Sequence, residues 1–216
     1  FLKMRGIYNI YFSFGQYVKK QFPVYNHRIM PSRIDVMSAV ADARAAAKKR
    51  QFERLGFAGK IQSVAVMDSY VIDAPLDERR LARAAKLLTN PLLENFSINA
   101  FVPPTEFTPI NPTTAGHGAG WAIEIGPLPG VTDNVGTTAR EVLEDGLRKK
   151  FKTGEKVYAS RVFFISGTLG RADAMRIADS LHNPLIERAL VKSAAECAHD
   201  GGMGVAIPRV KLASRA

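Results

Sequence analysis

Residues 64–94 (VAVMDSYVIDAPLDERRLARAAKLLTNPLLE) decide the fold, because residues 157–187 (VYASRVFFISGTLGRADAMRIADSLHNPLIE) repeat them. The two segments align without a gap at a constant offset of 93, and ten of the 31 paired positions are identical. A repeat unit of more than about 50 residues is a duplicated small domain and not a solenoid unit. We therefore expect two copies of one fold that pack as a pseudo-symmetric pair, like the subunits of a fused homodimer.

Each copy has the pattern of a β-α-β-α-β module. Apolar residues alternate in the predicted strands and recur at helical spacing in the predicted helices. The predicted strands are 33–37, 60–73 and 92–99 in the first copy and 121–125, 156–166 and 185–191 in the second. The predicted helices are 41–57 and 75–88, then 137–151 and 171–182. Asn-Pro ends the second helix of both copies, because a residue before proline avoids the helical region.

This pattern predicts an α+β fold of two tandem β-α-β-α-β modules that form a pseudo-dimer, with antiparallel sheets and the helices on one face. A three-stranded sheet with one uncovered face is marginally stable alone. We therefore expect the modules to pair across their sheets or edge to edge. Asp68 and Arg161 occupy equivalent positions in the two long strands. They can recognise each other as an opposite-charge pair or be solvated separately.

The chain divides around these modules. The predicted parts are an N-terminal extension (1–31), module 1 (32–101), a Pro- and Gly-rich linker (102–120), module 2 (121–196) and a C-terminal tail (197–216). The extension is rich in aromatic residues and has no carboxylate. We interpret it as an upstream extension before a translation start at Met30, with an amphipathic anchor as the alternative.

The distribution of charge argues against a nucleic-acid partner. Of the net charge of +10, residues 1–31 carry +5 and residues 197–216 carry +2, which leaves +3 for residues 32–196. A basic footprint for DNA or RNA is therefore weak in the predicted core. RNA binding through Tyr70, Tyr158 and Phe163 on an open sheet face is a minor alternative.

Other classes of site have little support. The single cysteine, Cys197, excludes an intramolecular disulfide, and we expect a spare thiol in a loose tail. A reducing, cytoplasmic location fits this cysteine content. No apolar run reaches the ~18 residues of a membrane span. The histidines lack partners at metal-ligand spacing, and residues 116–120 (GHGAG) lack the preceding strand and following helix of a dinucleotide loop. We expect no catalytic residue and no metal site.

One segment has a functional character. Residues 126–140 (GPLPGVTDNVGTTAR) join a predicted strand to a predicted helix, whereas the first copy has the plainer segment 39–45 (AVADARA) at this point. Capping of the helix by Asp133 or Asn134 explains part of this composition, and exposed amides at a helix start can also hold an anion. Because only one copy is elaborated, we expect a contact site for a partner. The candidate residues are Asp133, Asn134, Gly136, Thr137, Thr138 and Arg140.

This segment also carries a resemblance. Residues 126–141 (GPLPGVTDNVGTTARE), followed by a strand, a helix and NPLIE at 183–187, resemble the PurS-type domain of phosphoribosylformylglycinamidine synthase. The similarity covers roughly residues 32–195, is strongest at 122–187 and is more degenerate in the first copy.

The resemblance implies a role in de novo purine synthesis. Enzymes of this family use ATP and glutamine to make formylglycinamidine ribonucleotide, and PurS bridges the PurL-type synthetase and the PurQ-type glutaminase. In large single-chain versions a duplicated PurS-like region forms the N-terminal domain. The chain would then be non-catalytic and would assist ammonia transfer, with ATP, Mg and glutamine used by its partners and residues 126–140 contacting the synthetase. The alternative is a stand-alone ferredoxin-like regulatory module that binds a small effector.

Overall fold

The computed structural model describes residues 30–107 and 120–208. Most of the predicted extension, the linker residues 108–119 with four residues of the glycine-rich segment, and the end of the predicted tail lie outside the described residues.

The described residues form an α+β fold with one six-stranded antiparallel sheet and five α-helices. The strands are β1 (Ser32–Ser38), β2 (Ile61–Asp73), β3 (Glu94–Ile98), β4 (Trp121–Pro127), β5 (Lys156–Gly167) and β6 (Glu187–Ser193). The helices are α1 (Ala43–Phe52), α2 (Glu78–Leu87), α3 (Asn134–Leu147), α4 (Arg171–Leu181) and α5 (Ala194–Asp200), with a π-helical turn η1 (Glu53–Phe57) and a 3-10 turn η2 (Thr105–Phe107). All six predicted strands and all four predicted helices are present, whereas α5 was not predicted.

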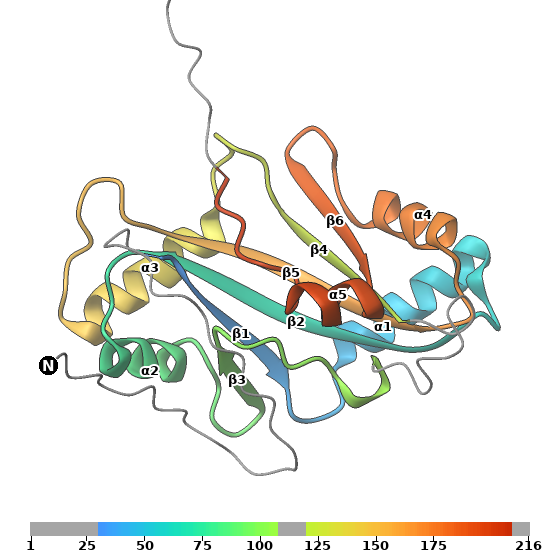
Figure 1. Ribbon diagram of the computed structural model, residues 1–216, viewed down its shortest axis with the longest axis horizontal. Coiled ribbons are helices and arrows are strands. Elements are labelled where there is room, and N and C mark those ends of the chain that lie inside the picture. The colour runs from blue at the N-terminus through green and yellow to red at the C-terminus, as the bar shows by residue number, and fades with distance from the viewer. Residues whose placement is uncertain (1–29, 108–119, 209–216) are drawn as a thin grey trace, which may run out of the picture.

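The order of strands in the sheet is β3-β1-β2-β5-β4-β6 (Figure 1). The long strands β2 and β5 pair antiparallel at its centre, so the two halves of the chain meet edge to edge. Asp68 lies directly opposite Arg161 in this pairing, and Arg161 Nε donates a hydrogen bond to Asp68 Oδ1 at 2.9 Å. Arg44 of α1 also bonds the Asp68 carboxylate. Of the two alternatives, the opposite-charge pair therefore forms, and the Arg161 side chain stays half exposed.

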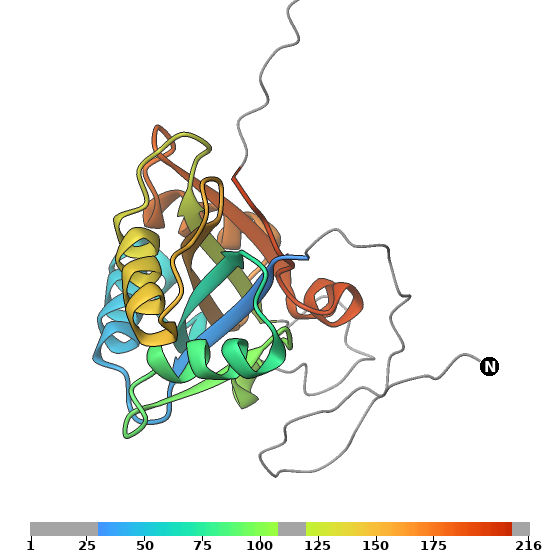
Figure 2. The same cartoon turned by 90° about the vertical axis from the view of Figure 1, so that its left-hand side faces the viewer.

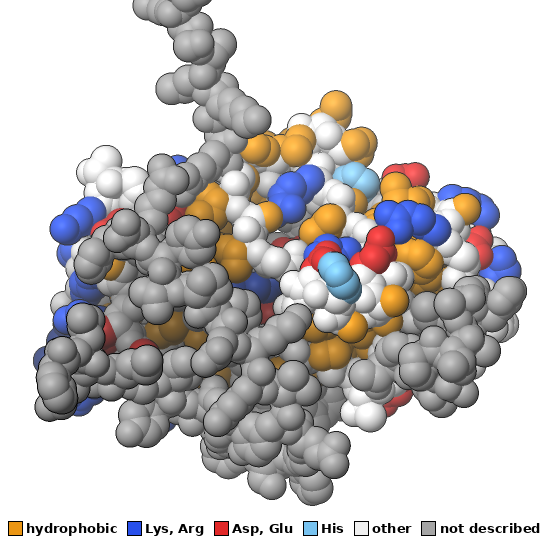
Figure 3. All heavy atoms as spheres, in the orientation of Figure 1, with side chains coloured by type: hydrophobic (Ala, Val, Ile, Leu, Met, Phe, Trp, Pro, Cys, Tyr) orange, Lys and Arg blue, Asp and Glu red, His pale blue; other side chains and the backbone are white. Residues whose placement is uncertain are grey.

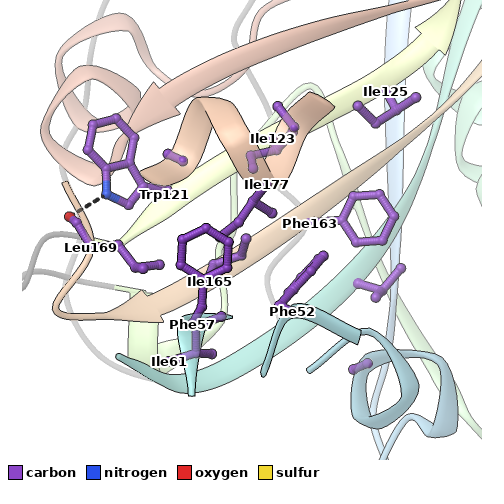
Figure 4. Packing of buried hydrophobic residues seen from close by; sticks show 14 residues of the cluster. Phe52, Phe57, Ile61, Trp121, Ile123, Ile125, Phe163, Ile165, Leu169 and Ile177 are labelled. Atoms are coloured by element: carbon purple, nitrogen blue, oxygen red, sulfur yellow. Dashed lines mark hydrogen bonds between the residues drawn. The ribbon is translucent and has the colours of Figure 1, made fainter. Parts of the chain in front are cut away.

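One face of the sheet carries two hydrophobic clusters. The first joins α1 and α4 to β2, β4 and β5 around Phe52, Phe163 and Ile177 (Figure 4). The second joins α2 and α3 to β1 and β2 around Ile34 and Leu143. Each large side chain buried in this way contributes about 1.5–3 kcal/mol. Because each cluster takes one helix from each half of the chain, neither half has a separate core on this face.

The opposite face is covered as well, which corrects the expectation of an open sheet face. Helix α5 lies on this side of the sheet and α1 and α3 on the other (Figure 2). Phe107 of η2 packs at 4.8 Å between ring centroids against Phe164 of β5, and Cys197 of α5 is fully buried. The expectation of a spare thiol in a loose tail is therefore wrong. Ser193 and Glu196 form a capping box that starts α5, and this sequence signal could have revealed the helix.

Phe163 is also buried beneath the helices, and Tyr158 lies on the opposite face of β5 from it. The three aromatic residues considered for RNA stacking therefore do not share an open sheet face.

Candidate functional site

The elaborated segment forms the connection from β4 to α3, and Asp133 holds it in place. Asp133 Oδ1 accepts a hydrogen bond from the Gly136 amide at 2.7 Å and caps α3. Its Oδ2 accepts a second bond, at 2.6 Å, from the amide of Ala159 in β5. One carboxylate therefore starts the helix and attaches the loop to the central strand of the sheet.

Gly136 is required by the close approach of α3 to β5. A Cβ atom at this position would overlap the Asp133 carboxylate and the carbonyl oxygen of Val157. The glycine φ angle is not in the left-handed region, so space and not backbone strain selects this residue.

Arg140 lies in the middle of α3, and its side chain bonds residues nearer the C-terminal end of the helix and just beyond it. Its Nε and Nη2 each donate to Glu144 Oε1 at 3.1 Å, and its guanidinium lies 5.8 Å from the Phe151 ring centroid. The pKa of Glu144 is lowered to about 2. The largest cause is the Phe151 amide, which donates to Glu144 Oε1 at 2.8 Å, and Lys150 and Arg140 lower the pKa further. Arg140 therefore serves to fix the turn that follows α3.

The remaining candidates lie in the first turns of α3. Asn134, Thr137 and Thr138 are exposed, and the Thr137 hydroxyl donates to the Asp133 carbonyl at 2.7 Å. Val135, between them, is 58% exposed. The structure thus divides the predicted site into residues with structural roles (Asp133, Gly136, Arg140) and residues that are exposed (Asn134, Thr137, Thr138).

A cleft of about 340 Å³ lies beside this turn on the helix-covered face of the sheet. Asp68, Tyr70 and Arg161 line it from the central strands, Lys48 from α1 and Asn134 from α3. Burial, together with the charges of Asp68 and Glu94, raises the pKa of Tyr70. Sequence reasoning missed Lys48 and considered Tyr70 only for RNA stacking, because both residues meet Asn134 only when α1, β2 and α3 assemble.

A second hollow of about 720 Å³ lies on the other side of the same loop. Gly130, Thr132 and Thr137 line it together with Arg140 and Lys156. Residues 130–133 therefore separate two hollows and present polar groups to both.

The other concentration of charge is buried on the opposite face of the sheet. Arg33 of β1 donates from Nε to Asp35 Oδ1 at 2.8 Å and from Nη1 to Glu124 Oε2 of β4 at 3.1 Å and to the Gly204 carbonyl at 2.7 Å. The Ser160 hydroxyl donates to Glu124 Oε1 at 2.6 Å. Burial raises the pKa of Asp35 more than the Arg33 charge lowers it, and the charge of Glu124 raises it further.

Within residues 30–107 and 120–208, no group of three or more His, Cys, Asp or Glu side chains is arranged to hold a metal ion. Over the same residues, none of the helices has both the length and the apolar character needed to cross a membrane.

Compared with known proteins, the sequence matches no protein-family model, and no curated protein matches it significantly. The functional assignment therefore depends on the residues and their geometry.

Proposed function

We propose that the chain is a PurS-like component of phosphoribosylformylglycinamidine synthase, built as a tandem pseudo-dimer and non-catalytic by itself. In this role it bridges a PurL-type synthetase and a PurQ-type glutaminase in the cytoplasm and assists the transfer of ammonia between them. ATP, Mg and glutamine are used by those partners, and the chain needs no cofactor of its own.

The symmetry of the strand pairing carries this proposal. The strand order reads the same from both edges when β1, β2 and β3 are matched to β4, β5 and β6. In the pairing of β2 with β5, Asp68 faces Arg161, which is the residue 93 positions later and therefore its own counterpart in the repeat. A pseudo-twofold axis between these two residues would relate the halves, as the fused-dimer interpretation requires.

The difference between the halves supports the partner site. Residues 39–41 separate β1 from the cap of α1, Asp42, whereas residues 128–132 separate β4 from the equivalent cap, Asp133. Both loops connect a strand to a helix that an aspartate caps. The two extra residues of the second loop and the hollows around it therefore provide surface that capping does not require. We assign this surface to the synthetase contact.

Reconstitution tests the bridging role. The chain should co-purify with the synthetase and glutaminase of its own source, and glutamine-dependent activity should appear only when it is added. Thr138→Arg should weaken synthetase binding without unfolding the chain, because Thr138 is exposed. Ala172→Arg, at an exposed position early in α4, is the matched control. Full glutamine-dependent activity without the chain would refute the bridging role.

The cleft of about 340 Å³ favours one second candidate, a regulatory module that binds a small effector. Its lining combines Lys48 and Arg161 with Asp68 and Tyr70, which suits a small polar ligand. Thermal shifts with amino acids, nucleotides and purine intermediates would separate the two functions. Stabilisation of the isolated chain by one such compound, with no binding to either protein, would favour the effector module.

A further inference from the structure

The turns that precede the two edge strands are built alike. In the first turn, Asn90 Oδ1 accepts the Leu92 amide at 3.0 Å, and the Asn90 amide donates to Glu94 Oε2 at 2.8 Å. The Asn90 carbonyl accepts the amides of Leu93 and Glu94 at 3.2 and 2.9 Å. Four hydrogen bonds, two of them made by side chains, therefore fix the conformation of five residues.

The second turn repeats these bonds. Asn183 Oδ1 accepts the Leu185 amide at 3.1 Å, and the Asn183 amide donates to Glu187 Oε2 at 2.9 Å. The Asn183 carbonyl accepts the amides of Ile186 and Glu187 at 3.1 and 2.8 Å. The same geometry thus occurs at both ends of the strand order, before β3 and before β6.

Both turns direct large apolar side chains into solvent. Leu92 is 85% exposed and Leu93 48%, and Leu185 is 83% exposed and Ile186 46%. We call these pairs the first tip (Leu92, Leu93) and the second tip (Leu185, Ile186). A single exposed leucine needs no explanation. Two equivalent apolar pairs that rigid turns hold outward need an explanation, because preorganised apolar anchors increase the affinity of protein interfaces.

The surroundings of the two tips differ. The Leu128 amide donates to the Ile186 carbonyl at 2.9 Å, so the second tip is continuous with the elaborated loop. The Ala39 amide donates to the Leu93 carbonyl at 2.8 Å, so the first tip is continuous with the short loop that contains the exposed Val40. The turn between α4 and β6 lies at the top of Figure 1 and the turn between α2 and β3 at the bottom, and hydrophobic side chains gather at the upper rim in Figure 3.

We infer that the two tips are anchors for two different protein partners, each of which offers an apolar socket that accepts a leucine side chain. The inference rests on the proposed bridging function and separates its two contacts. The equal tips supply the same anchoring chemistry at two edges that are too far apart for one small socket. The unequal loops beside them supply the discrimination: the second tip with residues 128–133 binds the synthetase, and the first tip with residues 38–40 binds the glutaminase.

Paired variants test this assignment. Leu92→Ser with Leu93→Ser should lower affinity for the glutaminase by about 30-fold, as expected for a central apolar anchor, and leave synthetase affinity unchanged. Leu185→Ser with Ile186→Ser should do the reverse. Met175→Ser on α4, where the side chain is 45% exposed, is the matched control and should change neither affinity. Calorimetry with each purified protein gives the affinities, and a thermal melt of each variant shows that the fold persists.

The outcomes separate the two ideas. If the unmodified chain binds both proteins and neither paired variant loses affinity, the tips are not anchors and the bridging role stands. Loss of both partners by each variant also refutes the assignment of one tip to one partner. Self-association that the serine variants abolish, seen by sedimentation, would show that a second copy occupies the tips and refute the inference. If the unmodified chain binds neither protein, the bridging function fails and the inference fails with it.

Discussion

Replacing Arg33 with methionine should destabilise this chain more than removal of any surface charge. The Arg33 side chain is only 8% exposed and bonds two buried carboxylates, Asp35 and Glu124. Methionine keeps most of the apolar volume of the side chain but removes the charge and every donor. The variant therefore leaves two carboxylates of like charge without their cation in the interior of the protein.

The expected loss follows from the geometry. Breaking a buried ion pair by removing one partner costs about 3–5 kcal/mol. A domain of this size loses about 2–4 °C in melting temperature for each kcal/mol, so the variant should melt about 10 °C lower at pH 7. Arg44→Met is the control: Arg44 is 43% exposed and bonds Asp42 and Asp68, and its removal should cost about 1 kcal/mol or less.

The dependence on pH gives a second readout. Burial raises the pKa of Asp35, so the folded state holds this proton more tightly than the unfolded state. The stability that protonated Asp35 contributes is complete below the ordinary pKa of an aspartate. This stability is lost as the pH rises through the raised pKa of Asp35 in the folded state. Without Arg33 the pKa of Asp35 rises further. Urea unfolding should therefore show a larger deficit for Arg33→Met at pH 7 than at pH 5. A deficit below 1 kcal/mol at both pH values would refute the reasoning.

Three further predictions concern α3 and α5. Gly136→Ala should lower the free energy of unfolding by about 1–3 kcal/mol in urea titrations, since its Cβ would overlap the Val157 carbonyl oxygen. The pKa of Glu144 is lowered to about 2, so its contribution to stability is present above its ordinary pKa and is lost as the pH falls toward 2. The stability difference between the unmodified chain and Glu144→Gln should therefore shrink between pH 7 and pH 3. Burial raises the pKa of the Cys197 thiol to about 11, and a thiol reagent should react with it only after unfolding.

Local patterns predicted the elements of this fold because local chemistry forms them. The alternation of apolar residues identified β2 and β5, and Asn-Pro marked the ends of α2 and α4. The predicted helix 41–57 covers both α1 and the π-helical turn η1, which ends at Phe57 after Gly56 adopts a φ of 95°. The start of α3 was placed at residue 137 instead of Asn134, although Asp133 was correctly considered as its cap.

Long-range contacts explain what the sequence left open. Local patterns could not choose between face-to-face and edge-to-edge pairing, because the choice depends on β2 and β5 completing each other's hydrogen bonds. In the candidate site, the second bond of Asp133 to Ala159 and the contact of Arg140 with Phe151 join segments 26 and 11 residues apart. These contacts give both residues structural roles, so variants at Asn134 and Thr138 are the cleaner tests of a partner surface.

If the chain is a tandem pseudo-dimer, as we propose, the buried Arg33–Asp35–Glu124 cluster gives a physical reason for joining the two copies. In the strand register, Asp35 lies opposite Ser69, and Glu124 lies opposite Val162. Ser69 and Val162 are 93 residues apart, which is the offset of the repeat. The two carboxylates therefore occupy equivalent positions in the two halves. Under our pseudo-dimer proposal, a symmetric homodimer would repeat Arg33 as well and bring two cations to the same seam. In this chain the equivalent position is Ala122, which is buried and apolar. A single guanidinium can then span β2 and β5 and bond a carboxylate from each half, an arrangement open only to halves whose sequences have diverged.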